Sequence, residues 1–193
     1  MGARVTNDGP KAWVASTSSP ASGDAPRFRA ELAEAAPAVR RFLFGLCGDW
    51  HRSEDLSQEA LLSAWHKRDS FNGQASLRTW VFAIARNHWL TGLRQQARRG
   101  REEPVNESCH IDLTAAPEAL AARGELADAV AAAMARLPDE QREALSLREL
   151  GGLTCVQVAD VLDLPLGTVK SRLRYAMGKL ARELEPFAQE LEP

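Results

Sequence analysis

Apolar residues recur at helical intervals through both halves of the chain, and no window alternates apolar and polar residues over the length of a strand. We therefore expect an all-α protein. In the first half, Pro37 suits the first turn of a helix that ends at Gly48. Ser53 and Ser76 suit the capping positions of the two helices that follow, and the polar segment 71–75 predicts the loop between them.

The second half repeats this periodicity after an interval without it. Thr154 and Gln157 form the T-x-x-Q pattern of a capping box, and Pro165 suits the first turn of the last helix. Helices are predicted over about 118–136, 140–150, 154–162 and 165–185. Gly151 and Gly152 end the second of these helices.

The predicted helices fall into two domains, residues 27–101 and 118–185. The segment 102–117 between them is acidic and lacks periodicity, so we expect a flexible linker. Residues 1–26 are rich in Ser, Thr, Ala, Gly and Pro and are predicted to form a flexible tail, with a second short tail at 186–193.

Composition excludes several classes of protein. The 193 residues are 45% hydrophobic and 26% charged, which is ordinary for a globular chain. No apolar run is long enough to span a bilayer, and the N-terminus lacks the apolar core of a secretion signal. Three cysteines are too few for a disulfide framework. We expect a cytoplasmic protein.

Charge is distributed unevenly, although the net charge is only −2. Residues 70–101 contain six arginines and no acid, and residues 164–182 contain five basic residues and no acid. Residues 102–163 hold thirteen acids against four arginines. A charge run usually reports a solvated surface, but two acid-free blocks on predicted helices favour two nucleic-acid-binding surfaces.

The last two predicted helices, joined by a short turn at Asp163, are typical of a helix-turn-helix. At 100° per residue, one face of the last helix is apolar: Val169, Leu173, Ala176 and Leu180. The opposite face carries Lys170, Ser171, Arg174 and Gly178, with Arg172 and Lys179 on a flank. Two long cations, a hydroxyl and a glycine suit base-edge and phosphate contacts in a major groove. An ordinary amphipathic surface helix is the alternative.

Four segments together resemble a known family. The run L-T-C-V-Q-V-A-D-V-L-D-L-P-L-G-T-V-K-S-R-L-R-Y-A (153–176) resembles the −35-binding module of bacterial sigma factors in the extracytoplasmic-function group, and R-L-P-D-E-Q-R-E-A-L (136–145) resembles the helix before it. E-D-L-S-Q-E-A-L-L-S-A-W (54–65) and S-L-R-T-W-V-F-A-I-A-R-N-H (76–88) resemble the group's polymerase-binding and −10-recognition helices. Asp163 departs from the family, because many relatives have glycine there.

This resemblance implies an alternative sigma factor with three kinds of partner: promoter DNA, an anti-sigma factor, and core RNA polymerase through the clamp of its largest subunit and the flap of its second subunit. It implies that the gene set served is responsive to stress or to a signal. The polymerase-binding candidates are Asp55, Leu56, Gln58, Glu59 and Leu62. Physical reasoning agrees, because an acidic helical face suits a protein better than DNA, although a capped surface helix remains the alternative.

The resemblance implies a base pocket around Asn72, Gly73, Gln74 and Ser76, with Arg78, Arg86 and Asn87 near the backbone, and the helical faces and the arginines past the core stripe add further DNA-binding candidates. The −10 candidates are Asn72, Gly73, Gln74, Ser76, Arg78, Trp80, Arg86, Asn87, Arg94, Arg98 and Arg99. The −35 candidates are Thr168, Lys170, Ser171, Arg172, Arg174 and Lys179. Trp80 and Trp89 offer rings for stacking on melted bases, although tryptophans on an amphipathic helix more often belong to the core. The acidic linker beside two cationic surfaces predicts that the domains mask one another and weaken binding to a −35 duplex.

The sequence predicts no catalytic site, no metal site, no cofactor and no small-molecule substrate. Cys47 with His51, and Cys109 with His110, are too few ligands for a metal unless the pairs come together, and buried or incidental cysteines explain them better. Two other functions stay open. A plain helix-turn-helix regulator would have no use for the 54–65 motif, and a nuclease or recombinase would need acids clustered beside a basic face.

Overall fold

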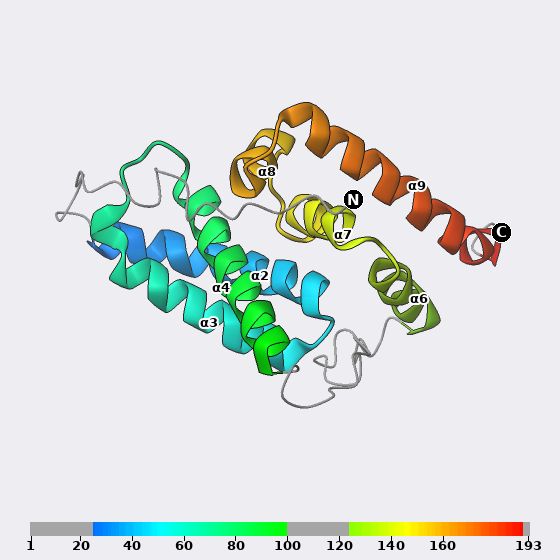
Figure 1. Ribbon diagram of the computed structural model, residues 1–193, viewed down its shortest axis with the longest axis horizontal. Helices are drawn as coiled ribbons and strands as arrows, with labels where there is room; N and C mark the ends of the chain where they lie inside the picture. Colours follow the sequence, from blue (N-terminus) through cyan, green and yellow to red (C-terminus); the bar gives the residue numbers. More distant parts are fainter. Residues whose placement is uncertain (1–24, 100–123, 191–193) are drawn as a thin grey trace.

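The computed structural model describes residues 25–99 and 124–190, and every regular element in these two ranges is a helix (Figure 1). The first range contains α2 (Ala25–Cys47), α3 (Trp50–His66), the short η1 (Arg68–Ser70) and α4 (Leu77–Arg99). The second contains α6 (Gly124–Ala135), α7 (Asp139–Leu145), the π-helical η3 (Ser146–Leu150), α8 (Cys155–Leu162) and α9 (Leu166–Glu190). We call these ranges the first and the second helical domain. The all-α prediction is confirmed for them, while the predicted linker lies outside the described residues.

Helix α2 differs from its prediction, because Pro37 lies inside it rather than in its first turn. Apolar side chains at helical spacing, including Leu32 and Val39, are buried on both sides of the proline. Pro37 itself is exposed, so its ring lies on the solvent face. Burial of one continuous apolar stripe outweighs the hydrogen bond that a proline removes from a helix.

The start of α3 was also predicted wrongly, whereas two other caps were predicted correctly. Asp49, not Ser53, caps α3: its carboxylate accepts a hydrogen bond of 3.0 Å from the backbone N–H of Arg52. Ser53 is buried within the helix and donates to the carbonyl of Trp50. Ser76 caps α4 by accepting from the backbone N–H of Thr79 at 3.1 Å.

The capping box of the second domain is present as predicted. The Thr154 hydroxyl accepts from the backbone N–H of Gln157, and the Gln157 side chain accepts from the backbone N–H of Thr154. At the other end of α8, Asp163 adopts a left-handed conformation with φ of 58° and turns the chain into α9. Aspartate tolerates this conformation better than most residues, so its presence in place of glycine preserves the turn.

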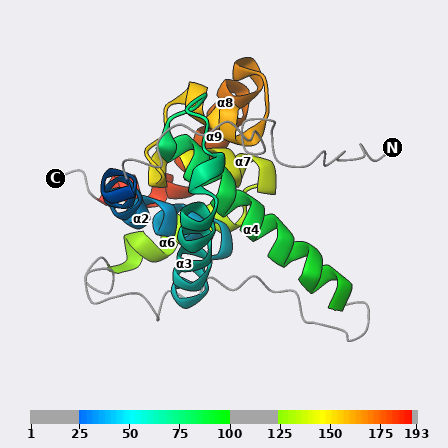
Figure 2. The same ribbon diagram turned by 90° about the vertical axis from the view of Figure 1, so that its left-hand side faces the viewer.

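The two domains are packed against each other (Figures 1 and 2). Helices α2, α3 and α4 pack together in the first domain, and α9 packs on α6, α7 and α8 in the second. Between the domains, η3 and α7 lie on α2, and α8 lies on α4. A single buried apolar cluster runs from Phe42 and Phe82 in the first domain to Leu147 and Leu153 in the second.

Candidate nucleic-acid interface and partner surface

The outward face of α9 is exposed where the sequence predicts it. Lys170 and Arg174 are exposed, while Val169 and Ala176 on the opposite side are completely buried. The Arg174 guanidinium lies over the Tyr175 ring, 5.0 Å from its centroid. A cation–π contact of this kind favours one orientation of a long side chain without neutralising its charge.

The other predicted −35 residues of α9 differ in their exposure and in their hydrogen bonds. Thr168 and Lys179 are half-buried. The Ser171 hydroxyl donates to the Thr168 carbonyl at 2.9 Å, so its lone pairs are left to accept from a ligand. Arg172 is directed elsewhere: its guanidinium donates to Glu140 at 2.6 Å, and its side chain is only 19% exposed. Arg172 therefore joins α9 to α7 in this structure and does not belong to the outward face.

The loop before α4 forms a polar turn. Gly73 has φ of +71°, a conformation that favours glycine, and the Asn72 side chain accepts from the backbone N–H of Gln74 at 3.2 Å. Gln74 and Ser76 are exposed beside it. The loop thus presents an amide, a hydroxyl and a flexible glycine at the N-terminus of a basic helix, which suits an unstacked base.

Base stacking on Trp80 is ruled out in this conformation. Its side chain is completely buried, with its ring 5.4 Å from that of Phe71 and 6.3 Å from that of Phe28. The alternative of a core tryptophan is the correct one. Trp89 is half-buried, and the Arg52 guanidinium lies over it at 5.1 Å from the ring centroid. Neither ring is open for stacking here.

The arginines of α4 differ along the helix. Near its start, the Arg78 guanidinium donates to the carbonyl of Gly151 at 2.6 Å. About two turns further along, Arg86 forms an ion pair of 2.8 Å with Glu143, and the side chains of the pair are only 24% and 14% exposed. Both partners belong to the second domain. The N-terminal arginines of α4 are therefore occupied by protein.

The distal part of α4 projects away from the rest of the molecule (Figure 2). Asn87 is half-buried, and Arg94 and Arg98 are exposed. Arg99 ends the helix, and its side chain lies outside the described residues. Exposed arginines past the packed part of a helix are free to contact phosphate.

The exposed side of α3 carries the predicted acids. Asp55, Gln58 and Glu59 are exposed, and Leu62 is 59% exposed, which is unusual for a leucine. Leu56 differs from this group because it is half-buried and packs against the core. The Glu59 carboxylate lies 3.6 Å from Nδ1 of His88.

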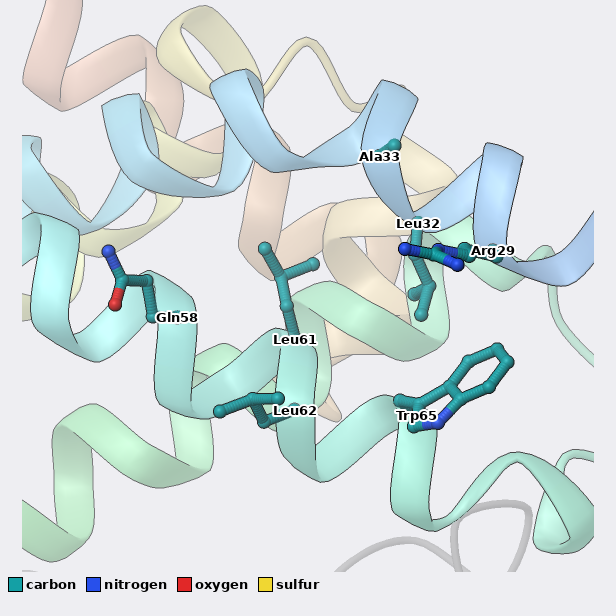
Figure 3. A pocket seen from close by; sticks show the side chains of 7 residues that line it. All are labelled: Arg29, Leu32, Ala33, Gln58, Leu61, Leu62 and Trp65. Atoms are coloured by element: carbon teal, nitrogen blue, oxygen red, sulfur yellow. The ribbon is translucent and has the colours of Figure 1, made fainter.

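An apolar groove adjoins this acidic side. Figure 3 shows Leu32 from α2 facing Leu61, Leu62 and Trp65 from α3, with Gln58 at one end. Acidic and amide groups beside an open apolar groove are the surroundings expected for a protein partner rather than for DNA.

The metal-site candidates are not assembled by the structure. Burial raises the pKa of the Cys47 thiol to about 11, and its Sγ donates to the Asp49 carbonyl at 3.2 Å. The thiol is therefore protonated at neutral pH in this structure. Within residues 25–99 and 124–190, no three potential metal ligands lie together, and Cys109 and His110 lie outside these ranges. No helix in the same ranges is long and apolar enough to cross a bilayer.

Sequence reasoning missed two kinds of residue that contact the candidate ones. Tyr175, 57% exposed, lies under the Arg174 guanidinium, and it could have been noticed as the only aromatic residue of the basic block 164–182. The second kind consists of residues that join the domains, such as Glu143 and Gly151. No local pattern reveals these, because each looks like an ordinary helix or turn residue.

Comparisons with known proteins identify both domains. Residues 32–99 match the model of sigma-70 region 2, and residues 133–182 match that of sigma-70, region 4. The chain is 35% identical over 157 residues to the ECF RNA polymerase sigma factor EcfG of Rhodopseudomonas palustris, covering 79% of this chain and 82% of the relative. It is 34% identical over 141 residues to the ECF RNA polymerase sigma-E factor of Escherichia coli, covering 69% and 74%.

A solved structure agrees with these matches. The sigma factor RpoE of Bartonella quintana, in complex with the anti-sigma factor NepR, superimposes with a TM-score of 0.65 at 27% identity, covering 82% of this chain and 97% of that chain. The order of the two matched regions, the cationic outward face of α9 and the relatives' names all point to one family. The chain belongs to the sigma-70 family of RNA polymerase sigma factors, in its extracytoplasmic-function group.

Proposed function

We propose that this chain, an alternative sigma factor that binds core RNA polymerase and directs it to promoters, divides the work among three surfaces. The −35 face is the outward side of α9, with Lys170, Ser171 and Arg174. The −10 surface is the loop 72–76 with the arginines of α4. The polymerase face is the acidic side of α3 with the adjoining groove.

The −35 face is supported by its exposure and its chemistry. Lys170 and Arg174 are exposed near the N-terminal half of α9, the part of a recognition helix that contacts base edges. An arginine donates two parallel hydrogen bonds to guanine, and Tyr175 holds Arg174 in place beforehand. Arg172 and Lys179, on the flank of α9, would not contact base edges.

The −10 surface is supported by its polar loop and by the arginines that follow it. Asn72, Gln74 and Ser76 would hold an unstacked base through hydrogen bonds, and arginines of α4 would bind the strand's phosphates. Capture of such a base offsets the cost of unpairing it, so binding itself opens the start site. Arg94 and Arg98, distal on α4, add phosphate attraction without reading sequence.

The polymerase face would dock on the clamp of the largest subunit, while the second domain would contact the flap of the second subunit. Asp55 and Glu59 supply negative charge, and Leu62 supplies an exposed apolar anchor. We further propose an anti-sigma partner, because a structural neighbour is a sigma factor in complex with one. The protein would act in the cytoplasm on a stress- or signal-responsive gene set, without catalysing a reaction.

The observation that carries this proposal is the combination, in one chain, of an acidic α3 face and an exposed cationic α9 face in the order of regions 2 and 4. The test is sedimentation with purified core polymerase, followed by transcription from a library of randomised promoters. We expect co-sedimentation and enrichment of templates that share two elements. A chain that binds duplex DNA but never polymerase would instead be a plain helix-turn-helix regulator.

A further inference from the structure

The groove between α2 and α3 is open and lined mainly by apolar side chains (Figure 3). Its volume is about 650 Å³, within the range of about 300–1,000 Å³ that is typical of sites for small ligands. Leu62 is 59% exposed along it, and Trp65 is half-buried at one end. An exposed apolar surface of this kind usually marks a binding site.

The chain enters the described structure beside this groove. Residues 1–24 lead into α2 at Ala25, and Arg29, one helical turn later, already lines the groove at the same end as Trp65 (Figure 3). Because a helix rises 1.5 Å per residue, Ala33 in the groove lies only about 12 Å along α2 from Ala25. The ten residues 15–24 span up to about 33 Å when extended. They are therefore long enough to let the residues before them turn back along the groove.

The four residues K-A-W-V at 11–14 have the chemistry that this groove accepts. Trp13 is the only aromatic residue among residues 1–24, and mostly small or polar residues surround it. A tryptophan buries about 150–250 Å² of surface and is a common anchor in apolar recesses. The segment therefore offers one large apolar group to a groove lined by Leu61, Leu62 and Trp65.

The charges along the groove favour one direction for this segment. Lys11 is the only charged residue between positions 9 and 23. Asp55 precedes Leu62 by about two turns of α3, so it lies on the same side of the helix, beyond Gln58 at the end of the groove opposite Arg29. A chain that runs back from Ala25 reaches the Arg29 end with Trp13 and the Asp55 end with Lys11. Opposite charges then meet at the far end, and the guanidinium of Arg29 faces an aromatic ring at the near end.

We propose that the groove holds residues 11–14 of this same chain, with Trp13 against Trp65 and Lys11 beside Asp55. Attachment to α2 gives the segment a high effective concentration at the groove, so a weak contact suffices to hold it. Gln58 and Leu62 line the groove and also belong to the proposed polymerase face, so the segment competes with polymerase for them. Only this competition rests on the proposed function, because the docking itself does not depend on it.

Two pairs of variants of the full chain test the proposal from its two sides. Trp13→Ser removes the anchor, and its matched control is Val5→Ser, an apolar-to-polar change elsewhere in residues 1–24. Ala33→Lys places a positive charge in the groove at an exposed position of α2. Its control is Ala30→Lys, at an exposed position of the same helix that does not line the groove. Lysine favours a helix, so we expect both lysine variants to fold.

Docking is measured by fluorine NMR on chains labelled with 5-fluorotryptophan, in the presence of a soluble gadolinium chelate that broadens the signals of exposed rings. The five tryptophan signals are assigned by single Trp→Phe changes. We expect Trp13→Ser to increase the broadening of Trp65, and Ala33→Lys to increase that of Trp13. The signal of Trp80, which is completely buried in the core, should stay unchanged and shows that each variant is folded. Both controls should match the unaltered chain.

Competition is measured as affinity for core polymerase on the same preparations. If about three molecules in four hold the segment in the groove, Trp13→Ser should bind polymerase about fourfold more tightly. Val5→Ser should bind as the unaltered chain does.

The two measurements separate this inference from the proposed function. If Trp65 is broadened equally in Trp13→Ser and in the unaltered chain, the docking is overturned and the sigma function stands. Protection of Trp13 that grows with protein concentration, together with a dimer in sedimentation, would overturn it in favour of a second copy as the occupant. Unchanged polymerase affinity of Trp13→Ser would overturn the competition. If Trp65 becomes exposed as expected but no chain binds polymerase, the docking is supported and the sigma function fails.

Discussion

The two basic helices of the molecule, α4 and α9, have the same signature in the sequence but different surroundings in the structure. Residues 77–99 of α4 and residues 166–182 of α9 each contain several cations and no acid. In α4, Arg78 and Arg86 are held by a carbonyl and a carboxylate of the other domain. In α9, Lys170 and Arg174 are exposed, and the ring under Arg174 leaves its charge intact. A run of positive charge thus predicts a cationic helix, but it does not predict whether the charge is available.

The difference arises because the acid-rich segment 102–163 forms its ion pairs with different parts of the two basic helices. Glu143 reaches across to α4, whereas Glu140 pairs with Arg172 on the flank of α9 and leaves the outward face open. One acidic segment therefore neutralises part of the proposed −10 surface and joins α7 to α9 beneath the proposed −35 face.

The largest effect should come from a surface that belongs to neither basic helix. In the double variant Asp55→Lys/Glu59→Lys, core polymerase should bind about a hundredfold more weakly, because reversed charges on a docking face repel the partner. Affinity for duplex DNA should rise slightly or stay unchanged. The control is Glu34→Lys/Asp69→Lys, an equal charge change at exposed positions elsewhere in the first domain. Sedimentation with polymerase gives the answer, and equal binding by both double variants would remove α3 from the polymerase contact.

Arg86→Ala should lower the free energy of unfolding by about 2 kcal/mol, because it leaves the Glu143 carboxylate half-buried without its partner. Arg94→Ala, an exposed arginine on the same helix, should change it by less than about 0.5 kcal/mol. Urea unfolding followed by circular dichroism measures both. Equal effects would contradict the distinction between the two ends of α4.

Arg174→Ala and Arg98→Ala should separate base reading from phosphate attraction. A base-reading arginine contributes roughly 1–3 kcal/mol of discrimination, so Arg174→Ala should relax preference at one or two positions of a randomised −35 library. Arg98→Ala should weaken binding to all sequences alike and reduce the salt slope by about one unit. A shifted preference for Arg98→Ala, or an unchanged one for Arg174→Ala, would reverse the assignment.

The smallest expected effect is a loss of stability at the cap of α8, the helix that packs on α9. Thr154→Ala removes half of the capping box of α8 and should cost about 1 kcal/mol of stability. Thr91→Ala, at an exposed position inside α4, should be neutral or slightly stabilising because alanine favours a helix. Thermal unfolding of the two variants side by side tests this, and a neutral Thr154→Ala would show that packing on α4 alone fixes α8.

The sequence correctly predicted those caps and turns that are formed by neighbouring residues. The capping box at Thr154, the cap at Ser76 and the turn at Asp163 are each formed by residues within a few positions of one another. The cap of α3 failed because Asp49 and Ser53 are both good capping residues, and only the burial of Ser53 against the core excludes it. Pro37 failed for a similar reason, since the buried stripe on both sides decides that α2 continues.

The candidate site was predictable only where it is exposed. Helical spacing placed Lys170 and Arg174 outward without further information. It could not show that Glu143 lies beside Arg86, because the two are fifty-seven positions apart and are brought together only by domain packing. Nor could it place Trp80 in the core with certainty, since this depends on Phe28 and Phe71 packing around the ring.

The continuous apolar cluster through Phe42, Phe82, Leu147 and Leu153 has a thermodynamic consequence. Two domains with separate cores melt independently, but domains that share buried side chains lose those contacts together. Heating the protein should therefore give a single calorimetric transition whose enthalpy and heat-capacity change belong to the whole helical assembly.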